Sequence, residues 1–168
     1  MTSILLLGSI AVPFLASILL FCGLPRSESS LHRIAYLAFG FPFVAGILLF
    51  LKFDPSCTGY CFEFLIERMG LHELGITFHL GLNGVSSPLF AMAGIVGLGA
   101  GIAAIHSGAD RLRLYLALLA LMQSGLMGLF ASVDLFFYYL FHHLCIIALW
   151  IWHSCRSLSL SYLGTPWV

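Results

Sequence analysis

Long apolar runs separated by shorter polar connections are the dominant pattern along this chain. An α-helix needs about 20 mainly apolar residues to cross the hydrocarbon core of a bilayer. Little chain remains for a soluble domain, so the pattern predicts an all-α integral membrane protein with a single membrane domain over residues 1–152. Five runs are long enough to predict transmembrane helices, at residues 3–22, 34–51, 85–105, 114–132 and 135–152.

The longest polar connection separates the second and third runs. Within it, residues 61–71 mix charged and apolar side chains at partly helical spacing, which predicts a short amphipathic helix on the membrane surface. Asp134 stands just before the fifth run, where its carboxylate is expected to cap the helix by accepting hydrogen bonds from backbone N–H groups. Residues 153–168 are too polar and too few for a sixth span and are predicted to form a polar tail.

The third run carries glycines at helical spacing. Gly97 and Gly101, with Gly94 one turn earlier, form the small-xxx-small pattern that lets two helix backbones approach closely. This pattern predicts tight packing against another helix and indicates no chemical role.

Composition agrees with the membrane class. Hydrophobic residues make up 61% of the chain, charged residues 8%, and the mean hydropathy is +1.05. The formal net charge is zero and no basic cluster could follow a phosphate backbone, so no nucleic-acid partner is expected. The partner that the composition implies is the lipid bilayer.

Basic residues beside the runs predict the orientation of the chain. The positive-inside rule places the N-terminus outside, because more basic residues fall on the opposite side. The first run has no basic residue before it and no clean cleavage pattern after it, so it is expected to be a retained helix. One side carries Arg26, Arg33, Arg111, Arg113 and Arg156, and the other carries Lys52 and Arg68.

Cysteines leave two interpretations open. Cys57 and Cys61 fall in the connection predicted to face outward, where an oxidising compartment would permit a disulfide bond, but free thiols are the simpler interpretation. Cys22 and Cys145 lie in or at the ends of apolar runs, where cysteine behaves as a small hydrophobic residue.

Two adjacent histidines, His142 and His143, occur near the middle of the fifth run. A charged side chain at the bilayer centre costs roughly 2.5 to 3.5 kcal/mol on insertion scales, so ionisable residues there normally face a protein interior or a water-filled path. Histidine exchanges a proton near neutral pH, which suits a relay. The alternative is a hydrogen-bonded histidine packed against a neighbouring helix.

Helical geometry separates the two histidines into different stripes. Successive residues on a helix point about 100° apart, so only one of the pair is expected to line a given path. His143 shares its stripe with Tyr139, and His142 shares a more polar one with Asp134 and Tyr138. The candidates for a proton path are therefore His143, His142, Tyr139 and Asp134.

Three segments in this order carry a resemblance to a known family: FEFLIERMG at 62–70, FHLGLNGVSSPLF at 78–90, and YLALLALMQSGLMGLFASVDLFFYYLF at 115–141. Together they resemble the N-terminal part of the antiporter-like subunit M, or chain 4, of proton-pumping NADH-quinone oxidoreductase, which is respiratory complex I. The resemblance implies a membrane-arm subunit in a bacterial or mitochondrial inner membrane, partnered by other membrane-arm subunits, with a share in proton translocation coupled to electron transport.

The sequence departs from the family pattern at informative positions. Asn83 stands where the family usually has aspartate, and His143 stands where it has an intramembrane glutamate that pairs with a lysine on a later helix. An imidazole can relay a proton but cannot supply a fixed negative charge. Family members also continue through further helices, so the resemblance implies a chain shortened after its fifth helix, unable to pump alone.

No cofactor is expected on this chain, because it has no glycine-rich phosphate loop after a strand and no clustered cysteine ligands. Any redox chemistry would then belong to partner subunits. One rival is a non-pumping structural or assembly fragment. Another is a haem-binding subunit of cytochrome b type, for which a second histidine at the depth of His142 or His143 is missing. The other histidines fall in connections or at the ends of runs: His32, His72, His79, His106 and His153.

Overall fold

The computed structural model describes residues 2–24, 27–54, 56, 59–66, 76–108 and 111–162, with side chains described as far as residue 155. Within these residues five helices are long and apolar enough to cross a membrane, which agrees with an integral membrane protein. The helices are α1 (Thr2–Phe21), α2 (Glu28–Leu51), α3 (Ser86–His106), α4 (Leu112–Ala131) and α5 (Leu135–Tyr162), and two strands, β1 (Cys61–Ile66) and β2 (Phe78–Leu82), lie between α2 and α3.

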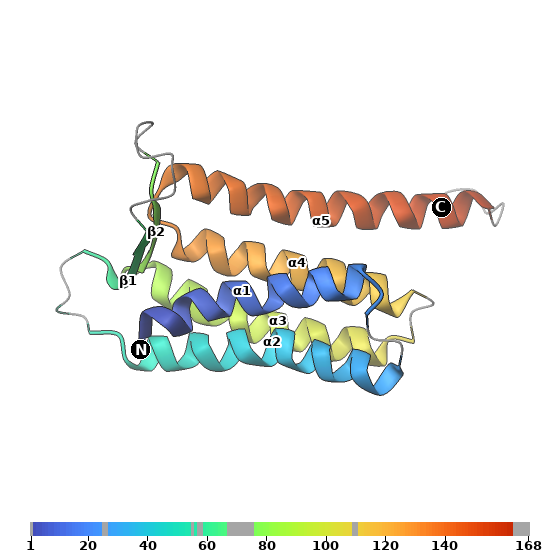
Figure 1. The fold of residues 1–168 in the computed structure, drawn as a ribbon, viewed down its shortest axis with the longest axis horizontal. Coiled ribbons are helices and arrows are strands. Elements are labelled where there is room, and N and C mark those ends of the chain that lie inside the picture. The colour runs from blue at the N-terminus through green and yellow to red at the C-terminus, as the bar shows by residue number, and fades with distance from the viewer. Residues whose placement is uncertain are drawn as a thin grey trace.

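The first four helices form an antiparallel bundle, and α5 lies along one side of it (Figure 1). Helix α4 has the central position, because it packs on α1, on α3 and on α5. The principal neighbour of α5 is α4. The N-terminus and the strands lie at one end of the bundle, and α5 extends past the other helices at the opposite end (Figure 1).

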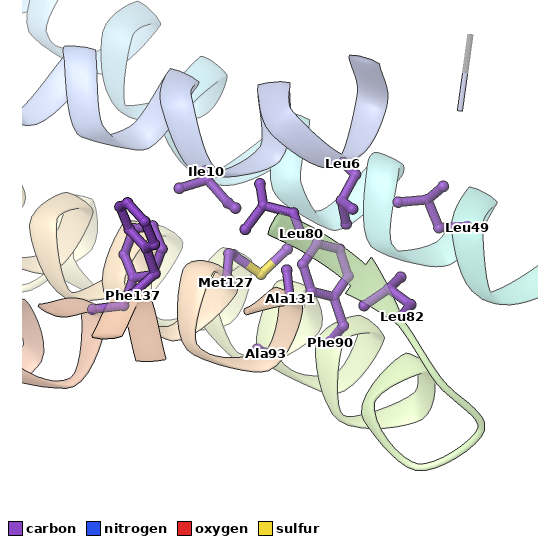
Figure 2. Packing of buried hydrophobic residues seen from close by; sticks show 11 residues of the cluster. Leu6, Ile10, Leu49, Leu80, Leu82, Phe90, Ala93, Met127, Ala131 and Phe137 are labelled. Carbon is purple, nitrogen blue, oxygen red and sulfur yellow. The ribbon is translucent and has the colours of Figure 1, made fainter. Parts of the chain in front are cut away.

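Two apolar clusters fill the bundle, one near each end. The cluster near the strands takes side chains from every helix and from β2, and Figure 2 shows Leu80 of β2 lying among side chains of α1 and α4. The second cluster takes its buried residues from α1 to α4 only, so α5 is anchored mainly through its first half. The buried members of the first cluster are Leu6, Ile10, Leu49, Leu80, Leu82, Phe90, Ala93, Met127, Ala131, Phe137 and Phe141.

Two helix boundaries differ from the sequence-based prediction. Helix α2 begins at Glu28 rather than at residue 34, because a helix can start in polar residues before the apolar span begins. Helix α5 runs to Tyr162, past the predicted end at residue 152. Its membrane-length part is Leu135–Cys155, so the continuation is an extension of the helix by polar residues, which contain no glycine or proline before Gly164.

The predicted amphipathic helix at residues 61–71 is wrong for its described part, which is strand β1. The strand pairs antiparallel with β2, with Phe64 opposite Leu80 and Ile66 opposite Phe78. Aromatic and branched side chains suit a pleated, half-buried surface, and the partner strand supplies the backbone hydrogen bonds that a surface helix would make internally. Residues 67–71 of the prediction lie outside the described residues.

One cysteine interpretation also needs correction. Cys61 is disulfide-bonded and is not a free thiol, whereas Cys22 is a free, exposed thiol and Cys145 a free, partly buried one. Cys57 lies outside the described residues. A disulfide at this end of the molecule is compatible with an oxidising compartment on that side.

Candidate functional site

Small residues on α4 determine which face of α5 is buried. A side chain at Gly128 would collide with the ring of Phe141, and a Cβ at Gly125 would come within 2.6 Å of Cys145 Sγ and 3.0 Å of the Phe141 carbonyl oxygen. The two glycines therefore let α5 approach α4 closely. The face so buried follows the helical spacing of Phe137, Phe141 and Ala148.

Both histidines are exposed and lie outside this packed stripe. Their ring centroids are 5.9 Å apart and the ring planes are nearly perpendicular, at 83°. Neither ring faces the interior of the α1 to α4 bundle. A proton-exchange partner on another helix would therefore have to approach α5 from its exposed side.

His143 is anchored to its own helix. Its Nδ1 lies 2.7 Å from the carbonyl oxygen of Tyr139, one turn earlier. A carbonyl oxygen only accepts hydrogen bonds, so Nδ1 donates, and Nε2 is the ring atom that can bind a further proton. Tyr139 thus takes part through its backbone, while its exposed ring makes an edge contact with Tyr138 at a centroid distance of 5.8 Å.

Asp134 caps α5, as predicted. Its Oδ1 accepts a hydrogen bond from the Phe136 N–H at 2.8 Å, which occupies one of the orphan donors of the first turn. Its Oδ2 accepts from the Thr77 N–H at 3.3 Å, immediately before β2. The Val133 N–H donates to the carbonyl oxygen of His79 at 3.0 Å. The carboxylate therefore joins the strand pair to the turn between α4 and α5.

The structure brings together only part of the predicted path. His143 and Tyr139 are in direct contact and His142 is adjacent, but Asp134 lies two turns away from His142 at the end of the helix and is engaged in capping. The polar stripe of Asp134, Tyr138 and His142 exists along α5, with Tyr138 N–H bonded to the Asp134 carbonyl.

A second set of polar side chains, inside the bundle, was missed in the sequence. Gln123 is buried and donates from Nε2 to the Ala93 carbonyl oxygen of α3 at 3.2 Å. Ser124 is also buried, and its hydroxyl donates to the Ile10 carbonyl oxygen of α1 at 2.9 Å. A Gln-Ser pair in the middle of an apolar run is the signal that would have revealed it, because polar groups at that depth need partners.

The glycines of α3 face two different partners. Gly94 lies against the α2 backbone, where an added Cβ would be 2.9 Å from the Pro42 carbonyl oxygen, and Gly101 lies against the ring of Phe39 on the same helix. Gly97 instead makes room for the side-chain amide of Gln123 on α4. The predicted tight packing is confirmed, with the small residues serving both neighbours of α3.

Known proteins match this chain over most of its length. A Rickettsia felis protein, NADH-quinone oxidoreductase subunit M, is 30% identical over 119 residues, which cover 70% of this chain. A Rickettsia typhi protein of the same name is 25% identical over 138 residues, or 80% of this chain. NAD(P)H-quinone oxidoreductase chain 4 3 of Picosynechococcus sp. is 32% identical over 99 residues, or 59% of this chain.

This chain is homologous to part of NADH-quinone oxidoreductase subunit M. The matched segments cover 24% of the Rickettsia felis subunit M, 28% of that from Rickettsia typhi and 18% of the Picosynechococcus protein. The chain therefore spans less than a third of the length of these relatives. No protein-family model matches the sequence.

Asn83, one of the two departures from the family pattern, caps the start of α3. Asn83 Oδ1 accepts hydrogen bonds from the N–H groups of Val85 at 3.0 Å and Ser86 at 2.7 Å, and the Ser86 hydroxyl accepts from the Asn83 N–H at 2.9 Å. These bonds satisfy donors at the start of α3. Aspartate, which the resemblance led us to expect here, and asparagine both accept well at helix starts, so asparagine keeps the cap and lacks only the charge.

A haem or metal site gains no support from the geometry of this subunit M relative. Among the described residues, no three histidine, cysteine, aspartate or glutamate side chains come together in a way that could hold a metal ion. Apart from the adjacent pair, His32 and His106 lie near helix ends, His79 lies in β2, and His153 lies at the end of the membrane-length part of α5. No described histidine faces His142 or His143 from another helix at the same depth.

Proposed function

We propose that this chain is a membrane-arm component of a multisubunit NADH-quinone oxidoreductase and contributes part of a proton path. The observation that carries the proposal is the homology to subunit M over 70% of the chain, with relatives whose names place them in such an oxidoreductase. Electron transfer would belong to other subunits of the complex. This chain would supply membrane-spanning helices and one titratable position.

The exposed side of α5 supports a position inside a larger helical assembly. Two histidines, Tyr138 and Tyr139 lie on this side, within a span that is only 17% buried in this chain. Ionisable side chains at mid-membrane are costly against lipid, so this face is better explained as facing other protein helices or water. His143 is then the group in position to exchange a proton, through Nε2, with a partner group on those helices.

A non-pumping structural role remains the second candidate, and one observation favours it. The His143 ring is satisfied by the Tyr139 carbonyl oxygen of its own helix. Within the described membrane-spanning segments no lysine or carboxylate lies in contact with it. A structural role requires only that α5 packs, whereas the relay requires the ring to titrate.

The two candidates are separated by purifying the oxidoreductase through a tag on this chain. Under our proposal, neighbouring membrane-arm subunits co-purify with it. In that complex His143→Gln should lower the rate of proton translocation through this path by about 100-fold, the low end of what a positioned proton-transfer group contributes. Translocation is measured with a pH-sensitive dye in reconstituted vesicles.

His142→Gln is the matched control, since it changes the adjacent exposed ring and should leave translocation near that of the unaltered complex. Equal, negligible effects of both substitutions would leave only the structural role. Isolation of this chain without any partner, from membranes in which the complex assembles normally, would contradict both the proposed function and the proposed partners.

We also propose that the end carrying the strand pair faces outside, together with the N-terminus. The excess of arginine at the opposite end and the disulfide at Cys61 both support this orientation. A membrane-impermeant amine reagent added to intact cells or right-side-out vesicles is expected to label the exposed Lys52. Labelling of Lys52 only after permeabilisation would reverse the orientation.

A further inference from the structure

A groove of about 210 Å³ lies between α4 and the second half of α5. It occurs where α5 no longer takes part in the shared core, because the second apolar cluster has no buried residue from α5. Nearer the N-terminal end of α5, Phe141 and Cys145 pack closely against Gly128 and Gly125 of α4. The groove is lined by Tyr115, Leu118, Leu119, Met122, Ala148, Leu149 and Trp152.

The lining favours hydrocarbon over water. A buried water needs two to four polar partners, and here the polar side-chain atoms of the lining are the Tyr115 hydroxyl and the Trp152 indole N–H, with the Met122 thioether only a weak acceptor. An apolar cavity of roughly 150 Å³ is enough to hold benzene. Both walls are membrane-length helices, so lipid acyl chains have the right chemistry and surroundings to fill this larger groove.

The mouth of the groove has the chemistry of a membrane interface. The rings of Tyr115 and Trp152 lie 4.7 Å apart and 31° from parallel, and such amphipathic rings prefer the headgroup level. The Arg111 carbonyl accepts from the Tyr115 N–H at 3.1 Å, which places exposed Arg111 one turn beyond that ring toward the headgroups. Among the described residues Arg111 is the exposed basic side chain next to this mouth, whereas Arg113 lies toward the end of α1, where its Nη1 is 3.6 Å from the position of a Cβ at Gly23.

We propose that this groove binds an anionic phospholipid. One acyl chain occupies the space between α4 and α5, and the phosphate of the headgroup lies beside Arg111. The apolar lining accounts for the acyl chain, and the exposed cationic side chain of Arg111 accounts for the preference for negative charge. The lipid then fills the gap between α4 and the extended end of α5.

The test uses the full chain with Trp152 as the only tryptophan, after Trp150→Phe and Trp167→Phe. The chain is reconstituted in phosphatidylcholine vesicles containing increasing mole fractions of either brominated phosphatidylglycerol or brominated phosphatidylcholine. Half-maximal quenching of Trp152 fluorescence is expected at a several-fold lower mole fraction of brominated phosphatidylglycerol than of brominated phosphatidylcholine. Arg111→Gln should reduce that preference by about fivefold, the factor that corresponds to one basic side chain at an anionic surface.

Arg33→Gln is the matched control, because Arg33 is an exposed arginine at the same end of the bundle but on α2, away from the groove. It should leave the preference unchanged. Ala148→Leu, which narrows the groove, should weaken quenching by phosphatidylglycerol while helix content stays constant. Equal quenching by both lipids, an unchanged preference in Arg111→Gln, or protection of Trp152 from both lipids by an associated protein helix would overturn the proposal.

Discussion

Gly128→Ala is expected to destabilise the chain by about 1–3 kcal/mol, the usual cost of overpacking a close-packed interior. The added methyl group would overlap the ring of Phe141, which is buried and lies on the stripe that joins α5 to α4. The ring cannot yield easily, because it belongs to the same cluster as Met127 and Ala131. The expected observable is a lower midpoint in sodium dodecyl sulfate titrations of the chain in mixed micelles, followed by circular dichroism.

Gly99→Ala provides the matched control for this substitution. Gly99 is also inside a membrane helix, but nothing lies within 4 Å of the position its Cβ would take. The same change there should leave the midpoint unchanged or raise it, since alanine is favoured over glycine in helices by up to about 1 kcal/mol. Phe141→Leu combined with Gly128→Ala should recover part of the loss, and full additivity of the two changes would contradict the proposed contact.

Asp134→Ala is expected to destabilise the chain by about 0.5–2 kcal/mol, the range for loss of an N-cap, with a further loss from the strand pair. The substitution removes acceptors from both the Phe136 and the Thr77 N–H groups. We expect backbone hydrogen bonds near the start of β2 to open more often than those of the helices. Hydrogen exchange at Thr77 and Phe136, measured by mass spectrometry in detergent, should rise first.

Asp134→Asn separates the two roles of this carboxylate. Asparagine keeps one side-chain oxygen to accept from the Phe136 N–H, but it places an amide N–H₂ group opposite the Thr77 N–H in place of the second carboxylate oxygen. Exchange should therefore rise near Thr77 and much less at Phe136. Asp54→Ala is the control, because among the described residues that exposed carboxylate bonds to Ser56 within its own loop, and the change should alter exchange in neither segment. Equal exchange at Thr77 in Asp134→Asn and the unaltered chain would show that the contact is dispensable.

Sequence reasoning located the spans because apolar length is a local property that the bilayer thickness directly selects. The N-cap at Asp134 was equally local, since the residue type and its place before an apolar run are sufficient. Helix ends were less accurate at Glu28 and Tyr162, because a helix can continue through polar residues on either side of the membrane.

The strand pair could not be inferred from residues 61–71 alone. Phe64 pairs with Leu80 across the connection, and the backbone bonds that select a strand come from this distant segment. The same holds for the disulfide at Cys61, which requires another sulfur to lie within bonding distance in space.

The sequence by itself determined that this chain is a set of membrane helices related to subunit M, and it identified the titratable residues of the fifth helix. Only the tertiary structure decided that Phe141 faces α4 and Phe137 packs on Phe78 of β2, while His142 and His143 are exposed. The reason is that a membrane helix is apolar on all sides, since lipid and packed neighbours are equally hydrophobic, so its pattern does not distinguish the buried face. That face was selected by shape, through the space that Gly125 and Gly128 leave for α5.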